Sequence, residues 1–141
     1  MHFDVTAQPL AADGLLAAVR SDEAGAVLLF YGVVRNNNLG RNVDHLVYDA
    51  YPEMATRVMA EIAEEARTRW DLTDVAIQHR TGRLEIGETS LIVAVSSPHR
   101  REAFEAGQWL VDRFKEVVPI WKKEVFEGGE EWIEGDLSRA P

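Results

Sequence analysis

The 141-residue chain contains no cysteine. It therefore cannot form a disulfide, a thiolate zinc site, an iron–sulfur cluster or a cysteine nucleophile. If the protein handles sulfur, another molecule must carry it.

Basic residues are also scarce: 15 Lys and Arg stand against 24 Asp and Glu, which gives a formal net charge of −9. This balance argues against a nucleic-acid-binding protein, because phosphate neutralisation needs a net basic face. Any anion site must instead be a local basic pocket. The N-terminus does not resemble a signal peptide and no apolar run is long enough to span a membrane, so we expect a cytoplasmic protein.

The length predicts a single domain over residues 1–141, and no internal repeat or low-complexity tract divides it. Residues from about 127 to 141 are a candidate flexible end. The acid-rich stretch from Glu124 to Asp136 is expected to be solvated.

Hydrophobic patterns predict alternating strands and helices. A short helical pattern surrounds residues 15–19, and the apolar run 26–34 predicts a strand buried on both faces. An asparagine-rich loop follows at 35–40. Further strands are expected at 45–51, 73–80, 89–96 and 120–126, and again after a GlyGly turn.

Two longer helices are predicted over 53–70 and from Ser97 to about Val118. The first has an apolar stripe that includes Met54. For the second, Ser97 is the expected N-cap, the apolar stripe begins at Phe104, and Pro119 ends the helix. This order of elements predicts an α+β fold with helices packed on a mixed or antiparallel sheet.

Three groups of basic residues are candidates for an anion site. His99 and Arg100 lie in the first turn of the second long helix, where the helix dipole disfavours cations unless an anion is bound. Lys115 lies at the edge of the apolar stripe. Lys122 and Lys123 must face opposite sides of their strand, so only one of them can share a pocket with Lys115.

Arg35, at the exit of the first apolar strand, is the third candidate. For all three groups, ordinary surface cations are the alternative interpretation. His2, His45 and His79 have no metal-ligand spacing and are interpreted as structural, so neither a metal nor a cofactor is expected.

Six motifs in order resemble the large, catalytic subunit of molybdopterin synthase across about residues 25–135. They are FYGVVRNNNLG (30–40), YPEM (51–54), E-A-R-x-R-W (65–70), H-R-x-G-x-L-x-x-G (79–87), S-x-H-R-x-x-A-F-E-A-G-Q (97–108) and K-x-x-x-P-x-W-K-x-E (115–124). The resemblance implies a sulfur transferase with an α/β-hammerhead fold and a central homodimer. Each end of the dimer would accept a small ubiquitin-like partner, forming a heterotetramer.

The resemblance further implies that the partner's C-terminal GlyGly carries a thiocarboxylate. The implied substrate is cyclic pyranopterin monophosphate (precursor Z), which receives two sulfurs to become molybdopterin in molybdenum cofactor biosynthesis. Lys115 and Lys122 match catalytic positions. Substrate-binding positions are assigned to Arg35, His99, Arg100 and Lys123.

An arginine that some family members place after the C-terminal tryptophan is absent here, and Arg139 is the candidate replacement. About 22 Å of helix would separate Arg100 from Lys115, so we expect His99 and Arg100 to act from the second subunit. Two alternatives remain open. One is an adaptor that binds the tail of a ubiquitin-like protein without chemistry, and the other is an unrelated phosphometabolite-binding enzyme.

Overall fold

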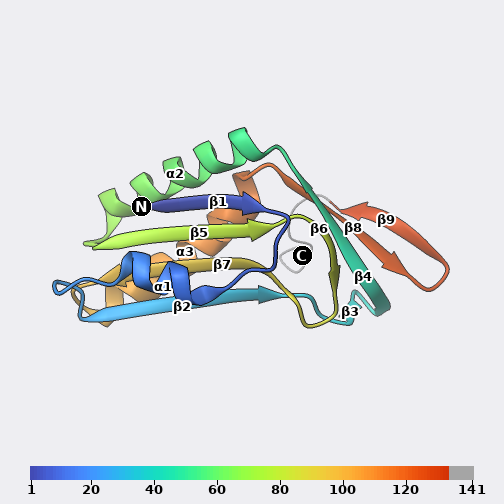
Figure 1. Cartoon of the computed structure of the whole chain (residues 1–141), viewed down its shortest axis with the longest axis horizontal. Coiled ribbons are helices and arrows are strands. Elements are labelled where there is room, and N and C mark those ends of the chain that lie inside the picture. Colours follow the sequence, from blue (N-terminus) through green and yellow to red (C-terminus); the bar gives the residue numbers. More distant parts are fainter. Residues whose placement is uncertain (134–141) are drawn as a thin grey trace.

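The computed structural model describes residues 1–133, which form two sheets and three helices (Figure 1). The first sheet has the strand order β1-β5-β7-β2. Its strands are β1 (His2–Thr6), β5 (Asp74–Arg80), β7 (Thr89–Ser97) and β2 (Ala26–Val33). β1 runs parallel to β5, whereas β5 and β2 are both antiparallel to β7. The predicted mixed α+β class is confirmed.

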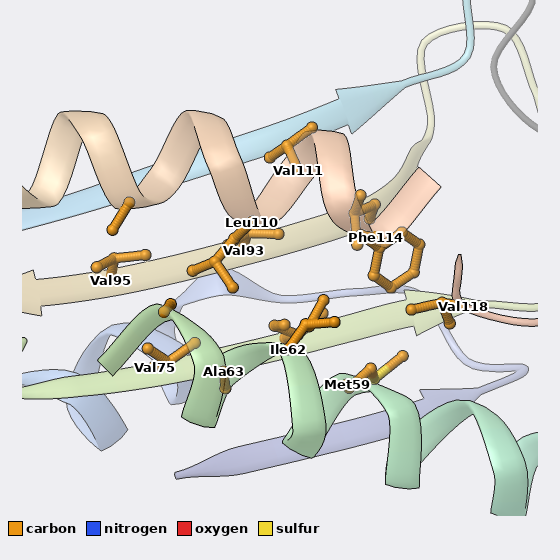
Figure 2. Packing of buried hydrophobic residues seen from close by; sticks show 14 of the residues in the cluster. Met59, Ile62, Ala63, Val75, Val93, Val95, Leu110, Val111, Phe114 and Val118 are labelled. Atoms are coloured by element: carbon orange, nitrogen blue, oxygen red, sulfur yellow. The ribbon is translucent and has the colours of Figure 1, made fainter. Parts of the chain in front are cut away.

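Helices cover both faces of this sheet because alternate residues of its central strands point in opposite directions. α2 (Pro52–Arg69) and α3 (Arg100–Val117) pack on the face formed by residues such as Val75 and Val93, where Ile62 and Leu110 complete the main core (Figure 2). The short helix α1 (Ala12–Val19) covers the opposite face of the sheet. Among residues 1–133, no helix is long and apolar enough to cross a membrane.

The second sheet lies at one end of the first, where β2, β5 and α3 end (Figure 1). Its path is β3 (Asn37–Asn38), β4 (Arg41–Ala50), β8 (Ile120–Phe126) and β9 (Gly129–Ile133), and β6 (Gly82–Glu85) also pairs with β4. The chain enters this sheet three times, from β2, β5 and α3. Residues at the ends of those elements therefore meet where the two sheets join.

Several sequence predictions are wrong in detail. β1 and β6 were not expected, since both are short and neither has a strong apolar pattern. β2 is not buried on both faces: it is the edge strand of its sheet, and Tyr31 and Val33 are 47% and 55% exposed. Ser97 does not cap α3 but belongs to β7, and His99 is the N-cap residue.

The apolar stripe of α3 also differs from the prediction. Phe104 is 62% exposed, whereas Ala103 and Ala106 face the core. Met54 at the start of α2 is likewise exposed. Gly107 is buried against β2, and a β-carbon at this position would collide with Leu28. The absence of a side chain is thus what allows the helix to approach the strand this closely.

Candidate active site

Two adjoining cavities lie at the junction of the two sheets. The larger has a volume of about 260 Å³ and the smaller about 80 Å³. The residues that line both are Gly32, Tyr48, Ser90, Lys115 and Lys122. We call the two spaces the large chamber and the small chamber. The two lysines therefore stand where the chambers meet.

Lys115 reaches this position from the last turn of α3. Its neighbour Phe114 is buried in the main core, which anchors the end of the helix. A cation in the last turn also interacts favourably with the negative end of the helix dipole. α3 ends at Val117, before Pro119, and the chain turns directly into β8.

Lys122 enters from β8, where it pairs with Tyr48 of β4. Glu124, two residues further along, faces the large chamber as well. Lys123 points to the other side of the sheet. Its Nζ lies 3.5 Å from Glu130 Oε2 and 5.5 Å from the ring centroid of Trp132, and it lines neither chamber. The prediction that only one of the two lysines shares the Lys115 pocket agrees with this arrangement.

The large chamber is more polar than the small one. Arg35 lines it, and its Nη2 donates a hydrogen bond of 3.5 Å to Asn38 Oδ1. Asn38 Nδ2 in turn donates to Glu124 Oε2. Arg41 binds the same carboxylate, with Nη2 3.2 Å from Glu124 Oε1. These contacts connect Arg35 to β8 through Asn38.

Glu124 corrects the expectation of a solvated acidic stretch, because its side chain is only 1% exposed. A buried carboxylate needs a cationic or hydrogen-bonding partner, and Asn38 and Arg41 supply both. Arg41 also pairs with Glu131, 2.6 Å away on β9. The hydrogen bond with Glu131 is the largest cause of the raised pKa of Arg41, ahead of the charges of Glu131 and Glu124. Residues two apart in a strand face the same side of the sheet. The inward position of Lys122 therefore predicts an inward Glu124, a consequence that the sequence analysis did not draw.

The small chamber is lined mainly by apolar side chains, and the one histidine in its lining is His79. The apolar lining residues are Leu91, Phe114, Val118, Ile120 and Ile133. Burial, and then the charge of Lys115, lower the pKa of His79 to about 4. The sequence analysis interpreted His79 as structural, because a single histidine without ligand spacing carries no functional signal.

His99 and Arg100 lie at the opposite end of α3 from Lys115 and line neither chamber. Both are exposed. A helix rises about 1.5 Å per residue, so the fifteen steps from Arg100 to Lys115 correspond to roughly 22 Å. One chain therefore brings together Arg35, Lys115 and Lys122, but not His99 or Arg100. Arg139 lies outside the described residues.

The arrangement suits the binding of anions by fixed cations. Three cationic side chains surround the large chamber, and the partly enclosed setting strengthens their attraction relative to water. Among residues 1–133, no group of three or more His, Asp or Glu side chains is placed to hold a metal ion.

Comparison with known proteins gives one consistent family. Residues 5–117 match the family model described as MoaE protein. The chain is 51% identical to the molybdopterin synthase catalytic subunit of Pyrococcus abyssi, covering 86% of this chain and 82% of that protein. It is 42% identical to the molybdopterin synthase catalytic subunit of Bacillus subtilis, covering 96% and 87%.

Solved structures agree. The molybdopterin synthase of Staphylococcus aureus superposes with a TM-score of 0.89 at 36% identity, covering 93% of this chain and 96% of that one. A complex of subunits 1 and 2 of molybdopterin-converting factor from Helicobacter pylori superposes with a TM-score of 0.76. It is 21% identical over 94% of this chain and 90% of that one, so it supports the fold alone.

Proposed function

The chain belongs to the MoaE protein family, and from this premise we propose that its two chambers carry out the sulfur transfer of molybdopterin synthase. Family membership makes the chain an enzyme of molybdenum cofactor biosynthesis. Its proposed substrate is cyclic pyranopterin monophosphate. The proposed sulfur donor is the C-terminal thiocarboxylate of a small ubiquitin-like partner.

The convergence of Lys115, Lys122 and Arg35 on adjoining chambers is the observation that carries this proposal. Both proposed reactants are anions, so they repel each other and need a cationic site to meet. A chain of net charge −9 supplies that site locally. Because the chain has no cysteine, the transferred sulfur must arrive on the partner.

The two chambers differ in a way that suits two different reactants. The large chamber contains Arg35 and fits the phosphorylated pterin. The small, mostly apolar chamber fits a narrow GlyGly tail, which has no side chains to accommodate. Lys115 and Lys122, at the junction, would bind the thiocarboxylate. Lys115 would either transfer a proton at the pterin side-chain carbons or attack the partner's acyl end.

His99 and Arg100 join this scheme only if a second copy supplies them. We propose a homodimer in which the start of α3 from one protomer completes the phosphate site of the other. The distance along α3 supports this arrangement, since one chain cannot place Arg100 and Lys115 on the same small substrate. Lys123 receives no role in either chamber.

The central test is turnover with defined components. The purified chain is mixed with thiocarboxylated partner and pterin substrate, and sulfur incorporation is followed by mass spectrometry. We expect wild-type protein to form the dithiolene product and Lys115→Ala to lose turnover while still binding the partner. Partner binding without any sulfur transfer by the wild type would instead favour a non-catalytic adaptor.

The composite site has its own test. In a heterodimer of Lys115→Ala and Arg100→Ala protomers, one site carries both lesions and the other carries neither. We expect about half of wild-type turnover, whereas each homodimeric variant is inactive, because a preassembled site acts as a unit. An inactive heterodimer would contradict the sharing of sites.

A further inference from the structure

Gly32 lies on β2 where the two chambers meet, and it lines both of them, as Lys115 does. Alternate residues of a strand face the same side of the sheet, so Gly32 faces the side of Leu28 and Phe30. Leu28 contacts α3 at Gly107, and Phe30 packs against the main core. The next position on this side carries no side chain. The wall of the chambers is therefore bare backbone at this point of β2.

The fold does not require a glycine at this position. Glycine is needed where φ is left-handed, but the φ of Gly32 is not. The pairing of β2 with β7 shifts register just after Gly32, yet a bulge needs glycine only where φ is positive. A β-carbon at Gly107 would collide with a neighbour, whereas one on Gly32 would make ordinary van der Waals contacts. It would lie 3.4 Å from Leu91 Cβ, 3.5 Å from Phe30 Cε1 and 3.6 Å from Ser90 Oγ.

A glycine inside a strand lowers stability where alanine would fit, because glycine loses more conformational freedom on folding. A strand glycine that neither the backbone nor the packing needs is typical of a place where a ligand or another backbone approaches closely. The buried hydroxyl of Ser90 donates a hydrogen bond of 3.1 Å to the Gly32 carbonyl oxygen, which holds this peptide in place beside the chambers. The chambers, and not the fold, therefore explain the glycine.

We propose that Gly32 is a specificity-determining residue: its missing side chain leaves the passage through which the partner's GlyGly tail reaches Lys115 and Lys122 from the small chamber. This inference rests on the proposed function, which places the tail in that chamber. The small chamber has a volume of only about 80 Å³, so even one added methyl group takes up a substantial share of it. Backbone lies against backbone at Gly32, which excludes a tail with side chains on its last residues.

Graded substitutions test the passage. Gly32→Ala adds one methyl group, and Gly32→Val adds a branched side chain of a type that suits strands. We expect kcat/KM for the thiocarboxylated partner to fall about 10-fold in Gly32→Ala and about 100-fold in Gly32→Val, the scale of reacting groups held out of position. Gly32→Ala should nevertheless unfold at a temperature no lower than wild type, because alanine loses less freedom on folding.

Gly129 provides the matched control. It also lies in a strand, β9, without a left-handed φ, and its β-carbon would lie 3.6 Å from the Phe126 ring. Unlike Gly32, it lines neither chamber. Gly129→Ala and Gly129→Val should therefore transfer sulfur at the wild-type rate.

Binding measures the passage without turnover. Calorimetry compares wild type and Gly32→Val, each titrated with the carboxylate form of the partner, either complete or with its two terminal glycines removed. We expect removal of the glycines to weaken binding to wild type but to change little with Gly32→Val, which already excludes the tail. The truncated partner should bind both proteins equally, whereas a misfolded variant would bind it more weakly.

The proposal is overturned by wild-type kcat/KM in Gly32→Val, or by a complete partner that binds this variant as tightly as wild type. It is also overturned if the Gly129 controls lose as much activity as the Gly32 variants, or if the loss in Gly32→Ala follows a lowered unfolding temperature. A wild type that binds the tail but transfers no sulfur would count against the proposed function instead. The calorimetric comparison would still decide the role of Gly32.

Discussion

Lys122 and Lys123 are neighbours in sequence, yet β8 directs them to opposite faces of the second sheet. On the inner face, Lys122 and Glu124 border the large chamber with Arg35. On the outer face, Lys123 lies beside Trp132 and Glu130. Similar side chains therefore have different surroundings: Lys122 borders both chambers, whereas Lys123, whose side chain is 23% exposed, borders neither. Position relative to the chambers, not residue type, therefore distinguishes the candidate site lysine Lys122 from its neighbour Lys123.

The largest expected difference between the faces is in catalysis. Lys122→Met should lower kcat by about 10²–10³-fold, the usual effect of removing one group that stabilises developing charge. Lys123→Met should leave sulfur transfer close to wild type, since its charge interacts with Glu130 at the surface. Both rates are measured by mass spectrometry of the pterin product. Equal losses in the two variants would remove the distinction.

The second expected effect is a loss of unfolding free energy at acidic pH, caused by His79 beside the chambers. His79 has a folded-state pKa of about 4, below the unfolded value of 6.5, so its stabilising contribution is complete above pH 6.5 and is lost as pH falls toward 4. The loss amounts to about 3 kcal/mol at pH 4. Urea unfolding of the wild type and of His79→Phe at pH 7 and pH 4 measures it as the difference between the proteins. A pH dependence that is unchanged in His79→Phe would show that other groups cause the loss.

A third comparison concerns two carboxylates. Glu124→Ala leaves Asn38 without its acceptor and Arg41 with only Glu131, so we expect a loss of about 2 kcal/mol in unfolding free energy. Glu130→Ala removes a surface pair and should cost about 0.5 kcal/mol or less. Urea denaturation midpoints provide the test, and a Glu124 variant as stable as wild type would show that its burial is unimportant.

The smallest expected effect is on the outer face itself. Trp132→Leu removes the ring beside the Lys123 ammonium, an exposed cation–π contact worth about 0.5 kcal/mol. We expect a correspondingly small decrease in unfolding free energy and no change in kcat. A large decrease in kcat would place the outer face in the function as well.

Strand alternation and helix periodicity predicted much of this site. They placed Lys115 at the end of a helix and showed that Lys122 and Lys123 could not share one pocket. They could not decide which lysine faces inward, because that depends on the pairing of β8 with β4. Local sequence patterns also failed to predict β1, because this strand is stabilised by its parallel pairing with β5, which is distant in sequence.

The burial of His79 and Glu124 was not predicted from the sequence, for a different reason. Each is a polar residue in an ordinary local setting, and only the meeting of separate elements buries it. His79 belongs to β5 but contacts Tyr48 of β4 and Phe114 of α3. Glu124 belongs to β8 but binds Asn38 and Arg41 around the β3–β4 turn. A single sequence does not reveal such long-range contacts.

The contact between Gly107 and Leu28 affects the relative positions of Arg35 and Lys115. Gly107 lies midway along α3, and Leu28 of β2 occupies the space where its side chain would be. From this contact, β2 leads to Arg35 and α3 leads to Lys115. The Gly107–Leu28 contact thus helps to fix the position of α3 on β2. The separation of Arg35 and Lys115 therefore depends on two residues that contact neither of them. A methyl group added at residue 107 would force the Leu28 side chain out of this space, so the packing of α3 against β2 would have to adjust.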